Sequence, residues 1–261
     1  MRMIAISLLA LCSLLLSKPA LAETNASSAD TDNEGRKLTW IGRLGYNLGG
    51  TAPMGIPASI RSIDTYRLTP SFMGGVDVVY SFTSKIGLLG GLRVELKDMD
   101  SEVSTKGYRM KVKMDEDEME GYYTGHVRQK VHMLMVTLPI QFRYDLSRVV
   151  ALKIGPYVSY LFDKNFSGYA FDGYLRKDDP TGAKVVMGTK EGEWATYEFP
   201  DDMRRWQFGI GVGADFTIYR GFGVSADLNW GLNGLMKSSF KTVDQVLYPI
   251  YGTIGIFCKL K

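Results

Sequence analysis

Hydrophobic residues alternate with small or polar residues throughout the segment 206–232. The apolar residues occupy alternate positions from Trp206 to Leu232, whereas Asp215 and Asp227 occupy positions between them, on the opposite parity. A period of two predicts two β-strands joined by a tight turn at Arg220-Gly221. Strands of ten or more residues, with aromatic residues near the ends of an apolar face, are typical of a transmembrane β-barrel.

The same alternation predicts six further strands. They cover residues 40–50, 72–82, 86–97, 133–144, 150–162 and 248–261. Charged residues make up 23% of the chain, so several would fall on the apolar faces by chance, yet none does. An Arg or Lys that faces lipid at the middle of a bilayer costs about 2–4 kcal/mol. This cost favours a membrane barrel, because a soluble barrel would tolerate charge outside and exclude it inside.

Short and long connections alternate along the predicted strands. The short ones lie at 83–85, 145–148 and 220–221, and the long ones at 51–71, 98–132, 163–205 and 233–247. This asymmetry is typical of periplasmic turns and extracellular loops. The sequence therefore predicts an all-β fold: an eight-stranded antiparallel up-and-down transmembrane β-barrel with four long extracellular loops and three short periplasmic turns.

The amino terminus has the features of an export signal. Arg2 precedes an apolar run, and a small-x-small motif ends at Ala22, which predicts a signal peptide over 1–22 with cleavage between Ala22 and Glu23. Residues 23–38 are polar and predict a disordered periplasmic leader, followed by the barrel over 39–261. Cleavage removes two basic residues and lowers the formal net charge from +3 to +1. This balance gives no reason to expect nucleic acid as a partner.

One cysteine, Cys258, remains after cleavage, so no intramolecular disulfide is expected in the mature chain. No apolar run after the signal approaches the length of a membrane helix. We expect export to the bacterial outer membrane, with lipid as the surrounding partner.

Polar residues on the inward parity predict a charged lumen. The residues expected to form this network are Arg43, Asp77, Arg93, Glu95, Arg143, Lys153, Tyr157, Asp215 and Asp227. Buried charges need partners, so we expect the basic and acidic members to pair. An eight-stranded barrel has an interior just wide enough for side chains, which favours a solid plug. A narrow solute path with a charged lumen is the alternative.

Aromatic residues on the outward parity gather near the predicted strand ends. Those expected to form the two interfacial girdles are Trp40, Tyr46, Tyr80, Tyr144, Tyr160, Trp206, Trp230 and Tyr248. Each of these residues taken alone could be an ordinary packed aromatic side chain. The prediction of the girdles therefore depends on their shared position near the strand ends.

No motif predicts catalysis, a cofactor or a metal. The chain has two histidines, His126 and His132, and neither lies in a recognised hydrolase or metalloprotease pattern. The acidic run at 111–120 lacks the spacing of a calcium loop, and we expect a solvated loop or a strand extension there. Residues 183–197 alternate after a turn signature at 178–182, which predicts a protruding hairpin.

Five segments carry a family resemblance: G-Y-N-L-G-G-T-A-P-M (45–54), T-L-P-I-Q-F-R-Y (137–144), I-G-P-Y-V-S-Y-L (154–161), F-S-G-Y-A-F-D-G-Y-L-R (166–176) and A-D-L-N-W-G-L-N (226–233). With these segments the chain resembles the Bacteroidetes-type outer-membrane β-barrel family that includes PorT-like proteins. The resemblance implies an outer-membrane barrel, and some members of that family are tied to secretion.

We therefore expect a non-enzymatic outer-membrane protein with a side-chain-plugged lumen and a structural or interaction role. Its long loops or periplasmic turns would contact another envelope protein, such as a transport or secretion complex. The alternatives are the narrow channel and, third, a lipid-modifying or hydrolytic enzyme.

Overall fold

The computed structural model describes residues 38–260, apart from 56, 115–116, 191 and 241–245. The described chain forms eleven strands: β1 (Leu38–Pro53), β2 (Ile60–Arg67), β3 (Phe72–Ser81), β4 (Ile86–Met114), β5 (Asp117–Asp145), β6 (Val150–Lys177), β7 (Lys184–Met187), β8 (Ala195–Glu198), β9 (Trp206–Tyr219), β10 (Phe222–Gly231) and β11 (Leu247–Leu260). The predicted cleavage site and the leader up to residue 37 lie outside the described residues. Leu38 belongs to β1, so the expected leader boundary was wrong by one residue.

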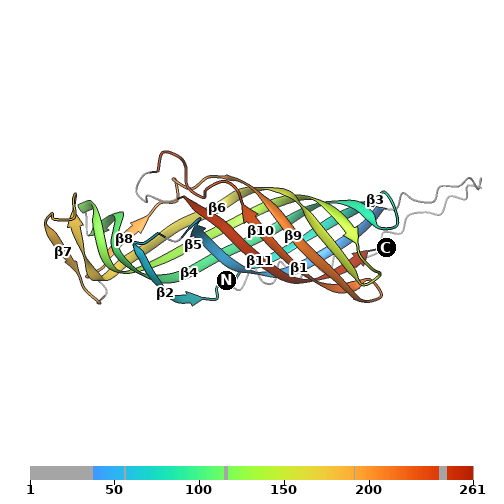
Figure 1. The fold of residues 1–261 in the computed structure, drawn as a ribbon, viewed down its shortest axis with the longest axis horizontal. Coiled ribbons are helices and arrows are strands. Elements are labelled where there is room, and N and C mark those ends of the chain that lie inside the picture. Colours follow the sequence, from blue (N-terminus) through green and yellow to red (C-terminus); the bar gives the residue numbers. More distant parts are fainter. Residues whose placement is uncertain (1–37, 56, 115–116, 191, 241–245, 261) are drawn as a thin grey trace, which may run out of the picture. The chain divides into compact units, whose positions relative to one another are not determined.

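Eight of these strands close into an antiparallel ring in the order β1-β3-β4-β5-β6-β9-β10-β11 (Figure 1). The ring closes where β1 pairs with β11, from Trp40 opposite Leu260 to Pro53 opposite Leu247. Closure leaves no unpaired sheet edge in the ring, which a bilayer requires because lipid cannot hydrogen-bond the backbone. The predicted eight-stranded barrel is confirmed.

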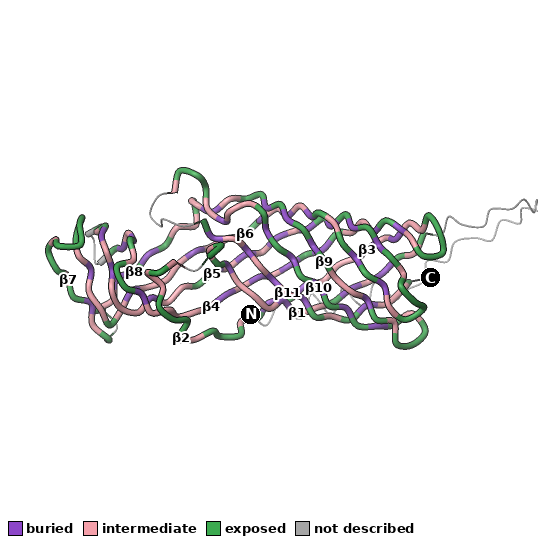
Figure 2. Tube along the Cα trace, viewed as in Figure 1, coloured by how far each residue is buried: buried purple, intermediate pink, exposed green. Residues whose placement is uncertain are grey.

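The alternation in the sequence becomes an alternation in burial. Along β10, successive residues are exposed and buried in strict turn (Figure 2). On β4, Leu92 is 55% exposed and its neighbour Arg93 only 3% exposed. The aliphatic side chains therefore face outward and the ionised ones inward, as a membrane barrel requires. The turn between β9 and β10 has positive φ at Arg220 and Gly221, the backbone of a type I′ hairpin turn.

Three strands continue well beyond the predicted ends. Strands β4 and β5 have 29 residues each and β6 has 28, whereas β3 and β10 have 10. Much of what was expected to be loop at 98–132 and 163–177 is therefore a continuation of the barrel wall (Figure 1). We call this extension the head: residues 98–114 of β4, 117–132 of β5 and 163–177 of β6, together with β2, β7 and β8.

The predicted hairpin is present at the turn signature 178–182, where β6 and β7 pair antiparallel from Gly173 opposite Met187 to Arg176 opposite Lys184. The rest of 183–197 was wrongly assigned to it, because β8 pairs with β6 and β4 and not with β7. The edges of the long strands β4 and β6 hold β8 in place of a pairing with β7, because they supply backbone partners already fixed in place. Strand β2 likewise pairs with β4 over residues 100–105.

Within the described part of the chain, no helix is long and apolar enough to cross a membrane.

Candidate functional site: the interior of the barrel and its head

Asp215 on β9 lies at the centre of an ionic network in the lumen. The guanidinium of Arg43 on β1 donates from both terminal nitrogens to its carboxylate, at 2.8 Å each. Arg143 Nη1 lies 2.8 Å and Lys153 Nζ 2.7 Å from the same carboxylate. A bidentate arginine contact fixes geometry as well as charge. Residues from β1, β5, β6 and β9 thus meet at one carboxylate across the lumen.

Two further carboxylates extend the network. Asp77 on β3 accepts from Arg43 Nε and from Arg93, whose Nη2 lies 2.8 Å from Asp77 Oδ2. Asp227 on β10 lies 2.8 Å from Lys153 Nζ. None of these five residues is more than 6% exposed. Since an unpaired buried charge costs several kcal/mol, each of these charges lies within ion-pair distance of an opposite one, although Lys153 and Asp227 meet by charge alone without a hydrogen bond.

Glu95 belongs to a separate group on the side of the head. It pairs with Lys97 at 2.7 Å and accepts a hydrogen bond from Thr137 Oγ1 at 2.7 Å. Lys97 has the same inward parity as Glu95 but was not among the lumen residues expected from the sequence. The structure thus places the expected lumen residues inside the barrel in two groups. Tyr157, the remaining expected member, is 5% exposed, and its ring packs against Gly209, where a Cβ would clash.

Glycines give these side chains their space. A Cβ at Gly91 would collide with Asp77 Oδ1, and one at Gly213 with Asp227 Oδ1. Both glycines lie opposite the aspartates in the neighbouring strand. The inward glycines are therefore needed to let the carboxylates reach the middle of the lumen.

The short-turn end of the lumen holds a layer that sequence reasoning missed. Ile41, Val79, Leu89 and Phe257 form a buried apolar cluster, each at most 4% exposed. Phe257 stacks with Arg43, whose guanidinium carbon lies 5.4 Å from the ring centroid. Their inward parity was the signal that could have found them, but an apolar residue on the polar face is easily taken for an interruption of the pattern.

The expected girdle residues lie on the outer surface near the two ends of the ring. Trp206 is 53%, Trp40 52%, Trp230 42% and Tyr144 37% exposed, and the remaining members, Tyr46, Tyr80, Tyr160 and Tyr248, are partly exposed. Several of the tyrosines pack against other outward aromatics, such as Tyr160 against Trp206 at 5.0 Å between centroids.

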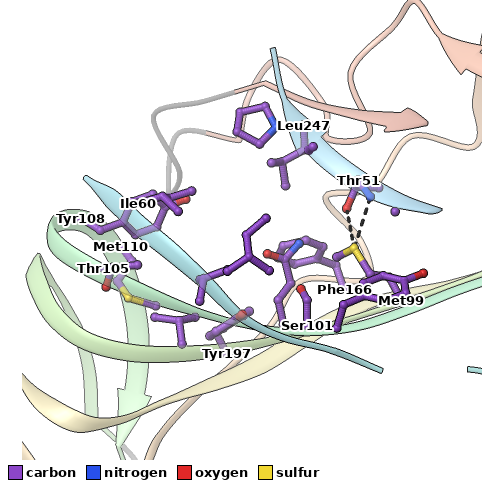
Figure 3. A pocket seen from close by; sticks show the side chains of 18 of the residues that line it. Thr51, Ile60, Met99, Ser101, Thr105, Tyr108, Met110, Phe166, Tyr197 and Leu247 are labelled. Carbon is purple, nitrogen blue, oxygen red and sulfur yellow. Dashed lines mark hydrogen bonds between the residues drawn. The ribbon is translucent and has the colours of Figure 1, made fainter. Parts of the chain in front are cut away.

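Inside the head the lining becomes apolar. The largest cluster of buried hydrophobic residues begins at the adjoining end of the ring, with Met133 and Met135, and continues into the head. It is rich in methionine and aromatic side chains, and its members in the head include Met99, Met110, Met187, Tyr123, Phe166 and Tyr197. Beside this core lies a cavity of about 420 Å³, which we call the outer chamber (Figure 3). Its lining comes from β1, β2, β4, β5, β6, β8 and β11. No sequence motif predicted it, because its walls come from seven strands and from Phe199 in the connection after β8.

A family model decides what kind of protein this is. The model described as "outer membrane protein beta-barrel domain" matches residues 25–237. The chain belongs to this outer-membrane β-barrel family. It is a protein of the bacterial outer membrane, as the outward aliphatic faces predicted. The narrower resemblance to PorT-like proteins stays a prediction.

Solved barrels cover most of this outer-membrane barrel chain at low identity. The attachment invasion locus protein Ail of Yersinia pestis is 12% identical, with 85% of this chain and 98% of that chain covered and a TM-score of 0.37. AlkL in lipid bilayers is 11% identical, with 92% and 97% covered and a TM-score of 0.36. OprG from Pseudomonas aeruginosa is 13% identical, with 86% and 97% covered and a TM-score of 0.31. No curated protein matches the chain.

His126 lies in a polar cluster on the outer face of the head. Asp64 of β2 accepts hydrogen bonds from Ser62 and Ser104, and His126 Nδ1 lies 3.3 Å from both Ser104 Oγ and Asp64 Oδ2. The Ser104 hydrogen bond, and after it that of Ser62, lowers the pKa of Asp64. In a catalytic triad the two imidazole nitrogens serve the nucleophile and the acid separately. Here one nitrogen faces both groups and the serine donates directly to the carboxylate.

The remaining candidates are paired within the head. His132 Nδ1 lies 2.8 Å from Asp98 Oδ1 on the outer face. In the run at 111–120, Lys111 pairs with Glu118, while Glu120 pairs with Arg109 at 2.7 Å. The expected strand extension is present there. Among the described residues, no group of three or more His, Cys, Asp or Glu side chains is placed to hold a metal.

Proposed function

We propose that this outer-membrane barrel is a non-enzymatic binding protein, whose lumen is closed by its own side chains and whose head carries the binding function. The observation that supports it is the network around Asp215. Arg43, Asp77, Lys153 and Asp215 have side chains that are 0% exposed, with ion pairs running from β1 across to β9. A solute path would have to pass these groups, and separating them would leave buried charges without partners.

The apolar layer at the short-turn end supports the same proposal. Ile41 and Phe257 are 1% and 2% exposed, so little water reaches the lumen beneath the ionic network. Two successive barriers of different chemistry, one ionic and one apolar, favour a closed lumen over a gated one. The geometry at His126 supports a binding role over an enzymatic one, because the imidazole is not placed to activate Ser104 while serving Asp64.

Planar-bilayer conductance tests the closed lumen. We expect the purified protein to give no steady, reproducible single-channel current. The double variant Arg43→Ala/Asp215→Ala removes one charge of each sign from the ionic barrier but leaves the apolar layer, so we expect it to stay closed, whereas adding Phe257→Ala should produce a current. Arg109→Ala/Glu120→Ala removes an exposed ion pair of the head and is the matched control, with side chains 46% and 45% exposed. A stable open pore formed by the unaltered protein would overturn the proposal.

Contact with another envelope protein through the long loops remains part of the proposal. Crosslinking in native outer membrane, followed by identification of the captured neighbour, tests it. Measured hydrolysis or acyl transfer that disappears in His126→Ala would instead establish the enzymatic alternative.

A further inference from the structure

The outer chamber has the size and lining of a ligand site. Its volume of about 420 Å³ falls within the range of roughly 300–1,000 Å³ that small-molecule pockets occupy. Labelled side chains from different strands line it in Figure 3, among them Ile60 of β2, Met110 of β4, Phe166 of β6 and Tyr197 of β8. Such a concave space admits a small molecule, whereas a folded partner could reach only its rim.

The polar groups of the lining are mostly bonded to the protein itself. Tyr66 donates to the carbonyl of Gly49 at 2.6 Å, Tyr197 to that of Arg128 at 3.0 Å, and Thr105 to that of Gly125 at 3.1 Å. A ligand that needed these groups would first have to break these bonds. The chamber walls therefore select against a polar ligand.

The lining carries one charged side chain, whose charge is already paired. Lys111 is the charged residue among the lining side chains, and its ammonium pairs with Glu118. Burial raises the pKa of Tyr197, so its phenol stays neutral. Gln129 adds an amide Nε2 that has no hydrogen-bond partner among the described residues. That donor, with the hydroxyl of Ser101, suits a ligand with few acceptors and no charge.

The geometry points to a site for one small uncharged hydrocarbon-like molecule, which we propose binds in the outer chamber from outside the cell. The inference rests on the proposed closed lumen, because the ionic network makes the chamber a receptacle and not the entrance of a path. The ligand is held by contact with Met99, Met110 and Phe166. Methionine side chains adapt to different apolar shapes, so the site accepts a class of hydrocarbons and not a single compound.

Methionine-methyl NMR of the mature protein in nanodiscs tests this inference, with naphthalene as the probe. We expect the Met99 and Met110 methyl signals to shift with a saturable, one-to-one dependence. Met73 is buried in the lumen among the polar residues, away from the chamber lining, and its signal should not move. Naphthalene-2-sulfonate, of the same shape with a fixed charge, should produce no saturable shift.

A matched pair of variants on β4 separates the chamber from the lipid. Val103 lines the chamber, whereas Val94 on the same strand is 52% exposed on the lipid-facing side. Val103→Trp fills the cavity and should abolish the saturable shift, while Val94→Trp should retain it. If Val103→Trp does not insert, Ser101→Phe fills the same space from the same strand.

Three results would overturn the inference. Methyl shifts that grow linearly with naphthalene, equally in both tryptophan variants, would show partitioning into lipid only. Equal saturation by the sulfonate would show that the site takes anions. Shifts of Met99 and Met110 that appear on raising protein concentration without probe would identify a second copy of the chain as the occupant. The conductance experiment tests the closed lumen separately. If the protein forms an open pore and still binds naphthalene saturably, the proposal of a closed lumen is wrong and the proposal of a ligand site in the chamber stands.

Discussion

Strand β5 has opposite polarity in its two halves. In the ring, Leu138 faces outward and is 49% exposed, while Gln141 and Arg143 are buried inside. In the head, the same parities carry Arg128 and Lys130 on the outer face and Val127 and Val131 in the core. The strand continues through both halves, with register shifts against β6 near residues 125 and 134. The polarity therefore changes because the surroundings change, while the β-strand conformation is kept.

The reversal shows where each half meets its solvent. Lipid forbids charge on the outer face of the ring, so polar side chains collect in the lumen and must pair there. Above the bilayer, water receives the charged side chains, and the interior returns to the apolar core of a soluble protein. Along β4, Lys97 and Met99 are successive inward residues and mark the change from the ionic lumen to the methionine-rich head.

Removing the central carboxylate of the ionic lumen should have the largest effect on the stability of the ring. Asp215→Ala leaves Arg43, Arg143 and Lys153 without their shared partner, which should lower the free energy of unfolding by about 3–5 kcal/mol. Urea unfolding in detergent micelles measures it. Asp145→Ala is the control, since that carboxylate is 36% exposed at the rim and should contribute at most about 1 kcal/mol. Equal losses would show that the network is not a buried one.

Shortening a methionine should destabilise the apolar core that continues into the head. Met135 is 0% exposed between the polar lumen and the head core, and Met135→Ala should cost about 2–5 kcal/mol through the cavity it leaves. The same unfolding experiment measures it. Leu138→Ala on the lipid-facing side of β5 should cost less, because detergent or lipid chains fill the gap. A smaller loss for Met135→Ala than for Leu138→Ala would contradict the packed head core.

Deleting one buried hydroxyl group, that of Tyr123, sharpens the comparison between the core and the outer face of the head. This hydroxyl lies within hydrogen-bond distance of two carbonyl oxygens. Tyr123 is 0% exposed, and its hydroxyl donates to the carbonyl of Phe171 at 2.6 Å. Tyr123→Phe leaves that carbonyl unsatisfied and should cost about 1–3 kcal/mol. Tyr122→Phe, at the preceding residue and on the opposite face of the strand, should leave the free energy of unfolding nearly unchanged. Thermal unfolding of the two variants in parallel provides the measurement.

Low pH should destabilise the outer face of the head, and we expect this effect to be the smallest of the four. Hydrogen bonds from Ser104 and Ser62 lower the pKa of Asp64, and one from Arg128 lowers that of Asp100. A lowered carboxyl pKa contributes stability that is present above the unfolded value, about 3.9 for aspartate, and is lost as the pH falls through the folded value. Hydrogen exchange should therefore show β2 opening more often near pH 3 than at pH 7.

The Asp64→Asn variant is the control for this acid effect. It should remove most of the pH dependence of β2 while leaving the exchange of β9 and β10 unchanged. An acid response of β2 that is identical in this variant would assign the effect to other groups.

The sequence by itself determined the barrel, its strand number and which face of each strand meets lipid. A period of two is set by the backbone of each strand alone, and the lipid penalty on charge makes the parity readable. It also identified Arg43, Asp77, Asp215 and Asp227 as inward residues, because each is a charged residue on the face opposite the aliphatic ones.

Only the tertiary structure decided which charges pair, how far the wall extends and where the chamber lies. Asp215 meets Arg43, 172 residues away, and that pairing depends on barrel closure and strand stagger, which no local pattern encodes. The alternation at 183–197 predicted a hairpin, and β7 does pair with β6 across the turn, but β8 pairs with β4 and β6 instead. Local patterns fix the conformation of a strand and the faces it presents, whereas its neighbours are chosen by competition among edges throughout the folded chain.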